Sequence, residues 1–243
     1  MHVPRRRKID IDIVTNSAAL LGGLGLFLLA VGMITDGLKF AAGDALRDIL
    51  ARSTSTPTRG VLSGVLVTAL VQSSSAVTVA TIGFVNAGLL TLPQSLGVVY
   101  GANIGTTMTG WLVASIGFKL DTLALPLVGL GMIGRLVRPG SRLGATGEAV
   151  AGFGLFFIGI EVLRGAFQGM ADTVDLAAFA PQSGLGLAMY AVLGFFMTVI
   201  TQSSSAAIAL TLTAASGGAL VLDAAAATVI GANVGTTSTA ALA

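Results

Sequence analysis

One five-residue motif, Gln-Ser-Ser-Ser-Ala, carries the polar groups of the chain that are best suited to binding a ligand. It occurs at 72–76 and again at 202–206, an offset of 130 residues. Each copy supplies three hydroxyl groups, which donate and accept hydrogen bonds, and one amide. Where a helix breaks, the N-terminus of a half-helix attracts an anion and freed carbonyl oxygens bind a cation. The motif therefore predicts a site for an anion such as phosphate, a cation such as sodium, or both.

A second motif, Gly-Ala-Asn-x-Gly-Thr-Thr, follows each copy of the first, at 101–107 and at 231–237. Its two glycines permit either helix unwinding or close approach of another backbone. Its Asn and Thr oxygens are neutral and would hold a cation weakly, which suits sodium in transit better than a divalent ion. The alternative is that these small residues only pack helices together in a membrane. We favour a binding site, because both motifs recur at one offset and contain a Gln or Asn that packing does not require.

The two motifs belong to a longer internal duplication. Gly-Leu-Phe-Leu-Leu at 25–29 resembles Gly-Leu-Phe-Phe-Ile at 154–158, at an offset of 129. We divide the chain into a basic N-terminal segment (1–17), repeat 1 (18–137), a linker loop (138–147) and repeat 2 (148–243). Repeat 2 lacks the last apolar stretch of repeat 1. We therefore expect a truncated chain, or one that completes its fold by forming a homo-oligomer.

Composition indicates an all-α integral membrane protein. Hydrophobic residues make up 54% of the 243 residues and charged residues only 10%, against about 25% charged in a soluble domain. The stretches 18–38 and 148–170 are long enough for plain transmembrane helices. The segments 60–86 and 185–216 have short apolar arms on either side of Gln-Ser-Ser-Ser, which predicts re-entrant hairpins or broken helices.

Several charged residues lie at the ends of the apolar stretches. The segment 39–59 predicts an interfacial helix followed by a loop, and Asp36 and Lys39 are expected at the membrane interface. A basic cluster at residues 5–8 favours a cytoplasmic N-terminus. Whether the two repeats have inverted topology depends on the number of crossings in each, which the pattern leaves open.

Several function classes are excluded by residue content. The chain has no Cys, and its single His is His2 in the polar N-terminus. A Ser-His triad or a His/Cys metal cluster within the membrane is therefore excluded, and we expect neither enzymatic activity nor a cofactor. The formal net charge of +2 gives no indication of nucleic-acid binding.

The paired motifs, together with Gly-Leu-Phe-Leu-Leu-Ala-Val-Gly-Met at 25–33, resemble the type II sodium-dependent phosphate cotransporter family and its bacterial members. The resemblance covers roughly residues 18–243. It implies two inverted repeats whose Ser-rich hairpins meet to bind phosphate and sodium in a multi-pass protein of the cell (inner) membrane. It also implies transport of inorganic phosphate driven by a sodium gradient.

The resemblance carries the family's binding role onto the matching positions. Phosphate and sodium would be bound by Gln72, Ser73, Ser74, Ser75, Gln202, Ser203, Ser204 and Ser205. The resemblance also implies that the Gly-Ala-Asn segments are unwound and support the site through Asn103, Thr106, Thr107, Asn233, Thr236 and Thr237. Two alternatives remain: a transporter of another small oxyanion, such as sulfate or a carboxylate, and a channel-like or structural membrane module.

Overall fold

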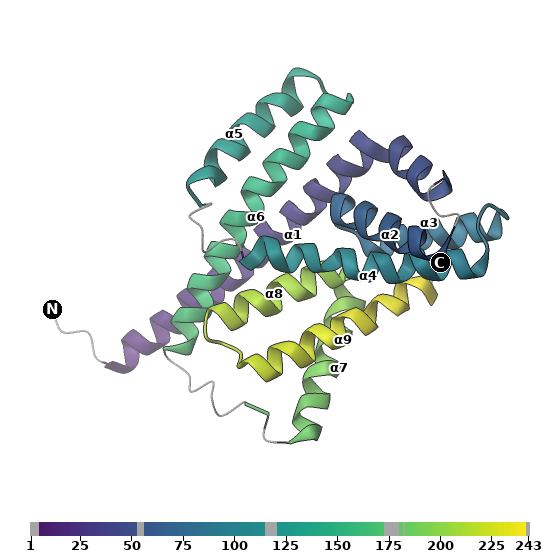
Figure 1. Cartoon of the computed structure of the whole chain (residues 1–243). Coiled ribbons are helices and arrows are strands. Elements are labelled where there is room, and N and C mark those ends of the chain that lie inside the picture. The colour runs from purple at the N-terminus through teal and green to yellow at the C-terminus, as the bar shows by residue number, and fades with distance from the viewer. Residues whose placement is uncertain (1–4, 53–55, 115–120, 173–179, 182, 242–243) are drawn as a thin grey trace.

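The protein is helical throughout its described part. The computed structural model describes residues 5–52, 56–114, 121–172, 180–181 and 183–241. Nine helices occur in these ranges (Figure 1): α1 (Arg5–Arg52), α2 (Pro57–Val71), α3 (Ser74–Asn86), α4 (Leu92–Ala114), α5 (Asp121–Val137), α6 (Arg142–Ala171), α7 (Gly184–Thr201), α8 (Ser204–Ser216) and α9 (Leu222–Ala241).

The longest helices, α1 and α6, form the main core. They run antiparallel, because Gly23 approaches Leu163 at one end of the contact and Gly37 approaches Ala149 at the other. Between these ends the ring of Phe27 packs against that of Phe156, with centroids 5.5 Å apart. The predicted spans 18–38 and 148–170 lie within these two helices. Within the segment 39–59, which was expected to form an interfacial helix and a loop, residues 39–52 are a direct continuation of α1.

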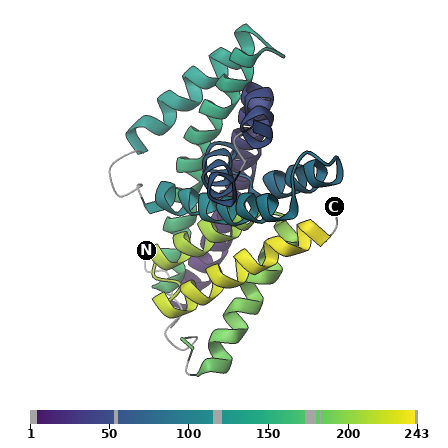
Figure 2. The same cartoon turned by 45° about the vertical axis from the view of Figure 1, so that its right-hand side comes forward.

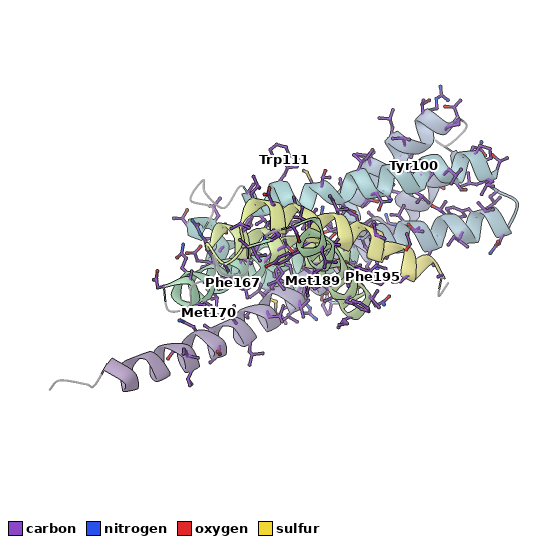
Figure 3. The ribbon with its side chains drawn as sticks, turned by 90° about the horizontal axis from the view of Figure 1, so that it is seen from below. Tyr100, Trp111, Phe167, Met170, Met189 and Phe195 are labelled. Atoms are coloured by element: carbon purple, nitrogen blue, oxygen red, sulfur yellow. The ribbon has the colours of Figure 1, made fainter. Side chains whose placement is uncertain are left out.

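The outer surface of the molecule is suited to lipid. Three helices of the described residues are long and apolar enough to cross a membrane, at Ile13–Gly43, Arg142–Ala171 and Gly184–Thr201. Large apolar side chains are exposed on several helices; Trp111 on α4 is 72% exposed and Ile200 on α7 is 80% exposed. Figure 3 shows Trp111 and Tyr100 projecting outward from α4. So much apolar surface is unfavourable in water and favourable in a bilayer, so the prediction of an all-α membrane protein is confirmed.

Two parallel helix pairs, α2 with α4 and α7 with α9, pack backbone to backbone through glycine. A Cβ on Gly101 would overlap the carbonyl of Val61, and a Cβ on Gly231 would overlap the carbonyl of Ala191, at the same positions 130 residues later. A Cβ on Gly105 would stand 2.8 Å from Thr68 Cβ, and one on Gly235 would stand 2.7 Å from Thr198 Cβ. Small residues thus allow these helices to approach closely.

This packing corrects one prediction. Both Gly-Ala-Asn-x-Gly-Thr-Thr segments lie inside continuous helices, α4 and α9, so the expectation that they are unwound is wrong. The physical reason is that glycine serves a close helix contact as well as a helix break, and here the neighbouring backbone fills the space that a side chain would need.

The remaining helices join the two pairs. Helix α3, which follows α2 in the chain, packs against α9 of the other pair, and α8, which follows α7, packs against α4. Each short helix therefore contacts the opposite helix pair. Figures 1 and 2 both show α5 and the beginning of α6 at one end of the molecule and α7 at the other. The turn between α5 and α6 covers residues 138–141, inside the predicted linker, and Ser141 caps α6 by accepting a hydrogen bond from the Gly144 amide.

Candidate functional site

The first Gln-Ser-Ser-Ser motif lies at a sharp break between α2 and α3, as predicted. Gln72 ends α2 with a left-handed backbone conformation, φ 55°. Ser73 is extended and caps α3, its hydroxyl accepting a hydrogen bond from the Ala76 amide. The Gln72 side-chain amide donates to the carbonyl of Ala69 at 2.6 Å. The break is therefore held by hydrogen bonds from the motif itself.

The second motif has the same local geometry between α7 and α8. Gln202 has φ 53°, and its side-chain amide donates to the Val199 carbonyl at 2.6 Å. Ser203 caps α8 by accepting from the Ala206 amide at 3.2 Å. Non-glycine residues in this backbone region are uncommon and carry strain. Strained conformations of this kind concentrate at ligand sites, where surrounding structure holds them.

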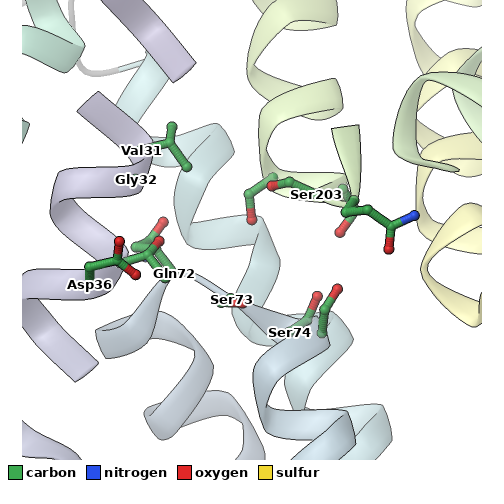
Figure 4. Close-up of a pocket in the computed structure, with 12 residues that line it drawn as sticks. Val31, Gly32, Asp36, Gln72, Ser73, Ser74 and Ser203 are labelled. Atoms are coloured by element: carbon green, nitrogen blue, oxygen red, sulfur yellow. The ribbon is translucent and has the colours of Figure 1, made fainter. Parts of the chain in front are cut away.

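Both motifs line one cavity of about 180 Å³, which is the central finding at this site. The structure thus brings together all eight residues expected to bind ligand, from positions about 130 residues apart. Figure 4 shows Gln72, Ser73 and Ser74 on one side of the cavity and Ser203 on the other. The lining consists of Val31, Gly32, Thr35, Asp36, Gln72, Ser73, Ser74, Ser75, Gln202, Ser203, Ser204 and Ser205.

The cavity favours an anion along two walls. Helices α3 and α8 both begin at it, and the first turn of a helix presents unpaired N–H groups and a partial positive charge. Ser204, at the start of α8, is 2% exposed, and its hydroxyl oxygen has no hydrogen-bond partner. A buried polar atom without a partner is uncommon and calls for an explanation. A ligand held between the two helix N-termini would supply the missing hydrogen bond.

Helix α1 contributes two polar residues that the sequence analysis did not assign to the site. Thr35 and Asp36 also line the cavity, whereas Asp36 was expected at the membrane interface. With Gly32 they follow the i, i+3, i+4 spacing that places residues on one helix face. That spacing was the available signal, but an aspartate near the end of an apolar stretch fits an interface equally well.

One further contact connects α4 to the site. The hydroxyl of Thr109 donates to Gln72 Oε1 at 2.8 Å, and both residues are buried. The Gln72 amide nitrogen donates to the Ala69 carbonyl, so both the nitrogen and the oxygen of this side-chain amide are hydrogen-bonded. Thr109 lies outside the Gly-Ala-Asn motif and was not predicted.

The expected supporting residues do not line the cavity. Thr106 donates to its own helix at the Ala102 carbonyl, as Thr107 does at Ile104 and Thr237 at Val234. Asn103 is partly buried in α4 and Thr236 is buried in α9. The side-chain nitrogen of Asn233 donates to the Val229 carbonyl, and its buried oxygen has no partner. In this arrangement the two segments pack α4 against α2 and α9 against α7.

The cavity lining offers a cation many neutral oxygen ligands but few negatively charged ones. The described residues contain no group of three or more His, Cys, Asp or Glu side chains that could hold a metal ion. Hydroxyl, amide and carbonyl oxygens with one carboxylate suit a weakly held monovalent ion, whereas tightly bound divalent ions need more carboxylates.

Comparison with known proteins gives one family and several relatives. The family model described as "Na+/Pi-cotransporter" matches residues 26–165 and 186–243. The Escherichia coli (strain K12) protein YjbB, whose name provisionally describes inorganic phosphate export, is 32% identical over 217 residues. The match covers 89% of this chain and 39% of YjbB, so the chain spans about two fifths of that relative's length.

No solved structure matches the chain. Two other relatives extend the sequence comparison. YqeW of Bacillus subtilis (strain 168) is 29% identical over 220 residues, which cover 89% of this chain and 69% of YqeW. The rat sodium-dependent phosphate transport protein 2A is 36% identical over 97 residues, or 39% of this chain and 15% of the relative. Since the family model matches most of the sequence, including both Gln-Ser-Ser-Ser motifs, the chain belongs to the Na+/Pi-cotransporter family.

Proposed function

We propose that this protein transports inorganic phosphate together with sodium across a cell (inner) membrane that it crosses several times, and that it holds phosphate between the two Gln-Ser-Ser-Ser motifs. The observation that carries the proposal is the single cavity lined by both motifs. Family membership supports phosphate as the substrate. The name of the rat relative supports sodium as the coupled ion.

The cavity offers phosphate hydrogen-bond donors from two directions. The first-turn amides of α3 and α8 and the hydroxyls of Ser74 and Ser204 would donate to phosphate oxygens. No basic side chain in the described part of the chain lines the cavity, so phosphate would be held by helix dipoles, backbone amides and hydroxyls. Binding of this kind is weak enough to permit release, which a transporter requires.

Sodium would take the oxygens that phosphate does not use. Gln72 Oε1 accepts a hydrogen bond from Thr109 and has a further lone pair, and the C-terminal ends of α2 and α7 carry carbonyl groups without helical partners. Half-helices whose N-termini meet an anion and whose C-termini meet a cation are a recurring design in secondary transporters.

Transport would follow from alternating exposure of this site by two halves of opposite orientation. In support, the sequence register pairs α1 with α6, and these helices run antiparallel in the core. The breaks at Gln72 and Gln202 would then form re-entrant segments that enter from opposite membrane faces. Rocking of one half against the other would expose the shared site to each side in turn.

Reconstitution in liposomes tests this function. Uptake of labelled phosphate is expected with sodium outside and not with potassium, and Ser204→Ala is expected to lower it about tenfold, the loss of one hydrogen bond to a charged group. Ser216→Ala, at the far end of the same helix, should leave uptake unchanged.

Two other results of the liposome assay would contradict the proposal. Phosphate uptake that is as fast with potassium outside as with sodium outside would contradict sodium coupling. Stronger inhibition by sulfate than by unlabelled phosphate would favour the alternative of another oxyanion.

A further inference from the structure

Asp36 occupies the junction of two cavities. Its side chain lines the Gln-Ser-Ser-Ser cavity and also a neighbouring cavity of about 340 Å³, which includes Phe40 of α1, Arg135 of α5 and the turn before α6. Figure 4 shows Asp36 on α1, on the same side of the first cavity as Gln72. Asp36 is the residue that the two linings have in common.

Among the described residues, this carboxylate is the one charged group that lines the Gln-Ser-Ser-Ser cavity. The basic residue of the second cavity, Arg135, lies 3.6 Å from Glu148 and is directed to that partner. A negative charge in an otherwise neutral cavity opposes the entry of an anion and attracts a cation. Phosphate would therefore enter readily only after a cation had offset this charge.

We propose that Asp36 is the charged ligand of the transported cation, and that this cation makes phosphate binding at the adjoining helix N-termini favourable. The inference rests on the proposed function and adds to it the residue that couples the two ions. Thr35 and Gln72 line the same cavity and offer neutral oxygens beside the carboxylate. One carboxylate with neutral oxygens suits a monovalent hard cation such as sodium.

The second half of the chain has no carboxylate at the position equivalent to Asp36. In the register that matches Gly25 to Gly154, the position of Asp36 is taken by Gly165 and that of Thr35 by Arg164. The coupling site is therefore present once per chain, although the Gln-Ser-Ser-Ser motif is present twice. Because coupling between two ligands is reciprocal, phosphate must also raise the affinity for sodium at this one site.

Calorimetric titration of the purified protein with phosphate, at several sodium concentrations and constant ionic strength, tests this role. In Asp36→Asn we expect the sodium concentration for half-maximal phosphate binding to rise about tenfold or more, within the usual range of coupling between sites. Asp36→Glu keeps the charge and should retain sodium dependence. Asp223→Asn makes the same chemical change at an exposed position in the first turn of α9 and should match the unaltered protein.

The possible results separate this inference from the proposed function. Unchanged sodium dependence in Asp36→Asn would overturn the role of Asp36 while leaving phosphate transport in place. If the unaltered protein binds no phosphate, the proposed function fails, and binding of radioactive sodium alone then decides the role of Asp36. Loss of sodium binding in Asp36→Asn, but not in Asp223→Asn, would support it, and equal binding in all three proteins would overturn it.

Discussion

At the residue scale, the site combines groups that a purely structural role would avoid. The hydroxyl of Ser204 is buried without a hydrogen-bond partner, an arrangement that costs about 1–3 kcal/mol. Gln72 and Gln202 both have left-handed backbones, which cost about 1–3 kcal/mol each in non-glycine residues. Such costs are expected where a ligand supplies the compensating interactions.

Replacing Ser204 by Ala separates stability from binding. The change removes a buried, unpaired hydroxyl, so we expect the melting temperature of the ligand-free protein to stay the same or to rise. The affinity for phosphate should fall about tenfold, because a hydrogen bond to a charged group is lost. Thermal melting in detergent and phosphate titration measure the two effects. A lower melting temperature with unchanged affinity would show that the hydroxyl serves packing.

At this scale the sequence predicted that the eight motif residues bind a ligand, because helix packing alone does not account for the repetition of both motifs at one offset. It did not predict that Asp36 lines the cavity, since one aspartate after an apolar stretch carries no repeat and fits a membrane interface. Thr109 was missed for a related reason. Its bond to Gln72 joins residues 37 positions apart, and only the packing of α4 against α2 brings them together.

At the element scale, the half-helices depend on their caps. Ser73 caps α3 at the cavity, whereas Ser183 caps α7 away from it. Replacing either residue by Ala should lower the free energy of unfolding by about 1 kcal/mol, the usual value of an N-cap. Only Ser73→Ala should also weaken phosphate binding, because it disturbs a helix N-terminus that faces the ligand.

Denaturant unfolding and phosphate titration on the two cap variants provide the comparison. Equal losses of affinity in both variants would show that binding follows overall stability. In that case the α3 N-terminus would have no direct part in the site.

The glycine contacts between helices give a second prediction at this scale. Gly231→Ala would place a Cβ against the Ala191 carbonyl, so α7 and α9 would have to separate. We expect a loss of about 1–3 kcal/mol, which is typical of overpacking. Gly83→Ala is the matched control, because a Cβ there meets no atom within 4 Å and Ala is the better helix former.

Thermal melting of the two glycine variants checks this prediction. Gly83→Ala should melt at the temperature of the unaltered protein or above it. If Gly231→Ala were equally stable, the close α7–α9 contact would be contradicted.

The elements themselves were only partly predictable. Hydropathy and length predicted the spans within α1 and α6, and polar residues between short apolar arms predicted the breaks at Gln72 and Gln202. The continuity of α4 and α9 was not predictable from Gly-Ala-Asn-x-Gly-Thr-Thr. Glycines four residues apart permit unwinding and also form a groove for a neighbouring helix, and the neighbour that fills the groove is set by tertiary packing.

At the scale of the whole molecule, the duplication accounts for much of the arrangement. Close contacts of α2 with α4 recur between α7 and α9, and α3 and α8 each cross to the opposite pair. These crossings bring two sequence-distant motifs to one cavity. Repetition in the sequence predicted that two equivalent elements exist, but which helix each would contact depends on packing that the sequence pattern does not express.

The central claim is that two distant motifs form one phosphate site, and the stoichiometry of binding tests it most directly. Titration of phosphate in sodium, on the unaltered protein and on Ser74→Ala and Ser204→Ala separately, should give one phosphate per chain. Each substitution should lower the affinity of that single site about tenfold, since each removes one donor to a charged ligand. Two independent phosphates per chain, or an affinity that responds to only one of the two serines, would contradict the shared site.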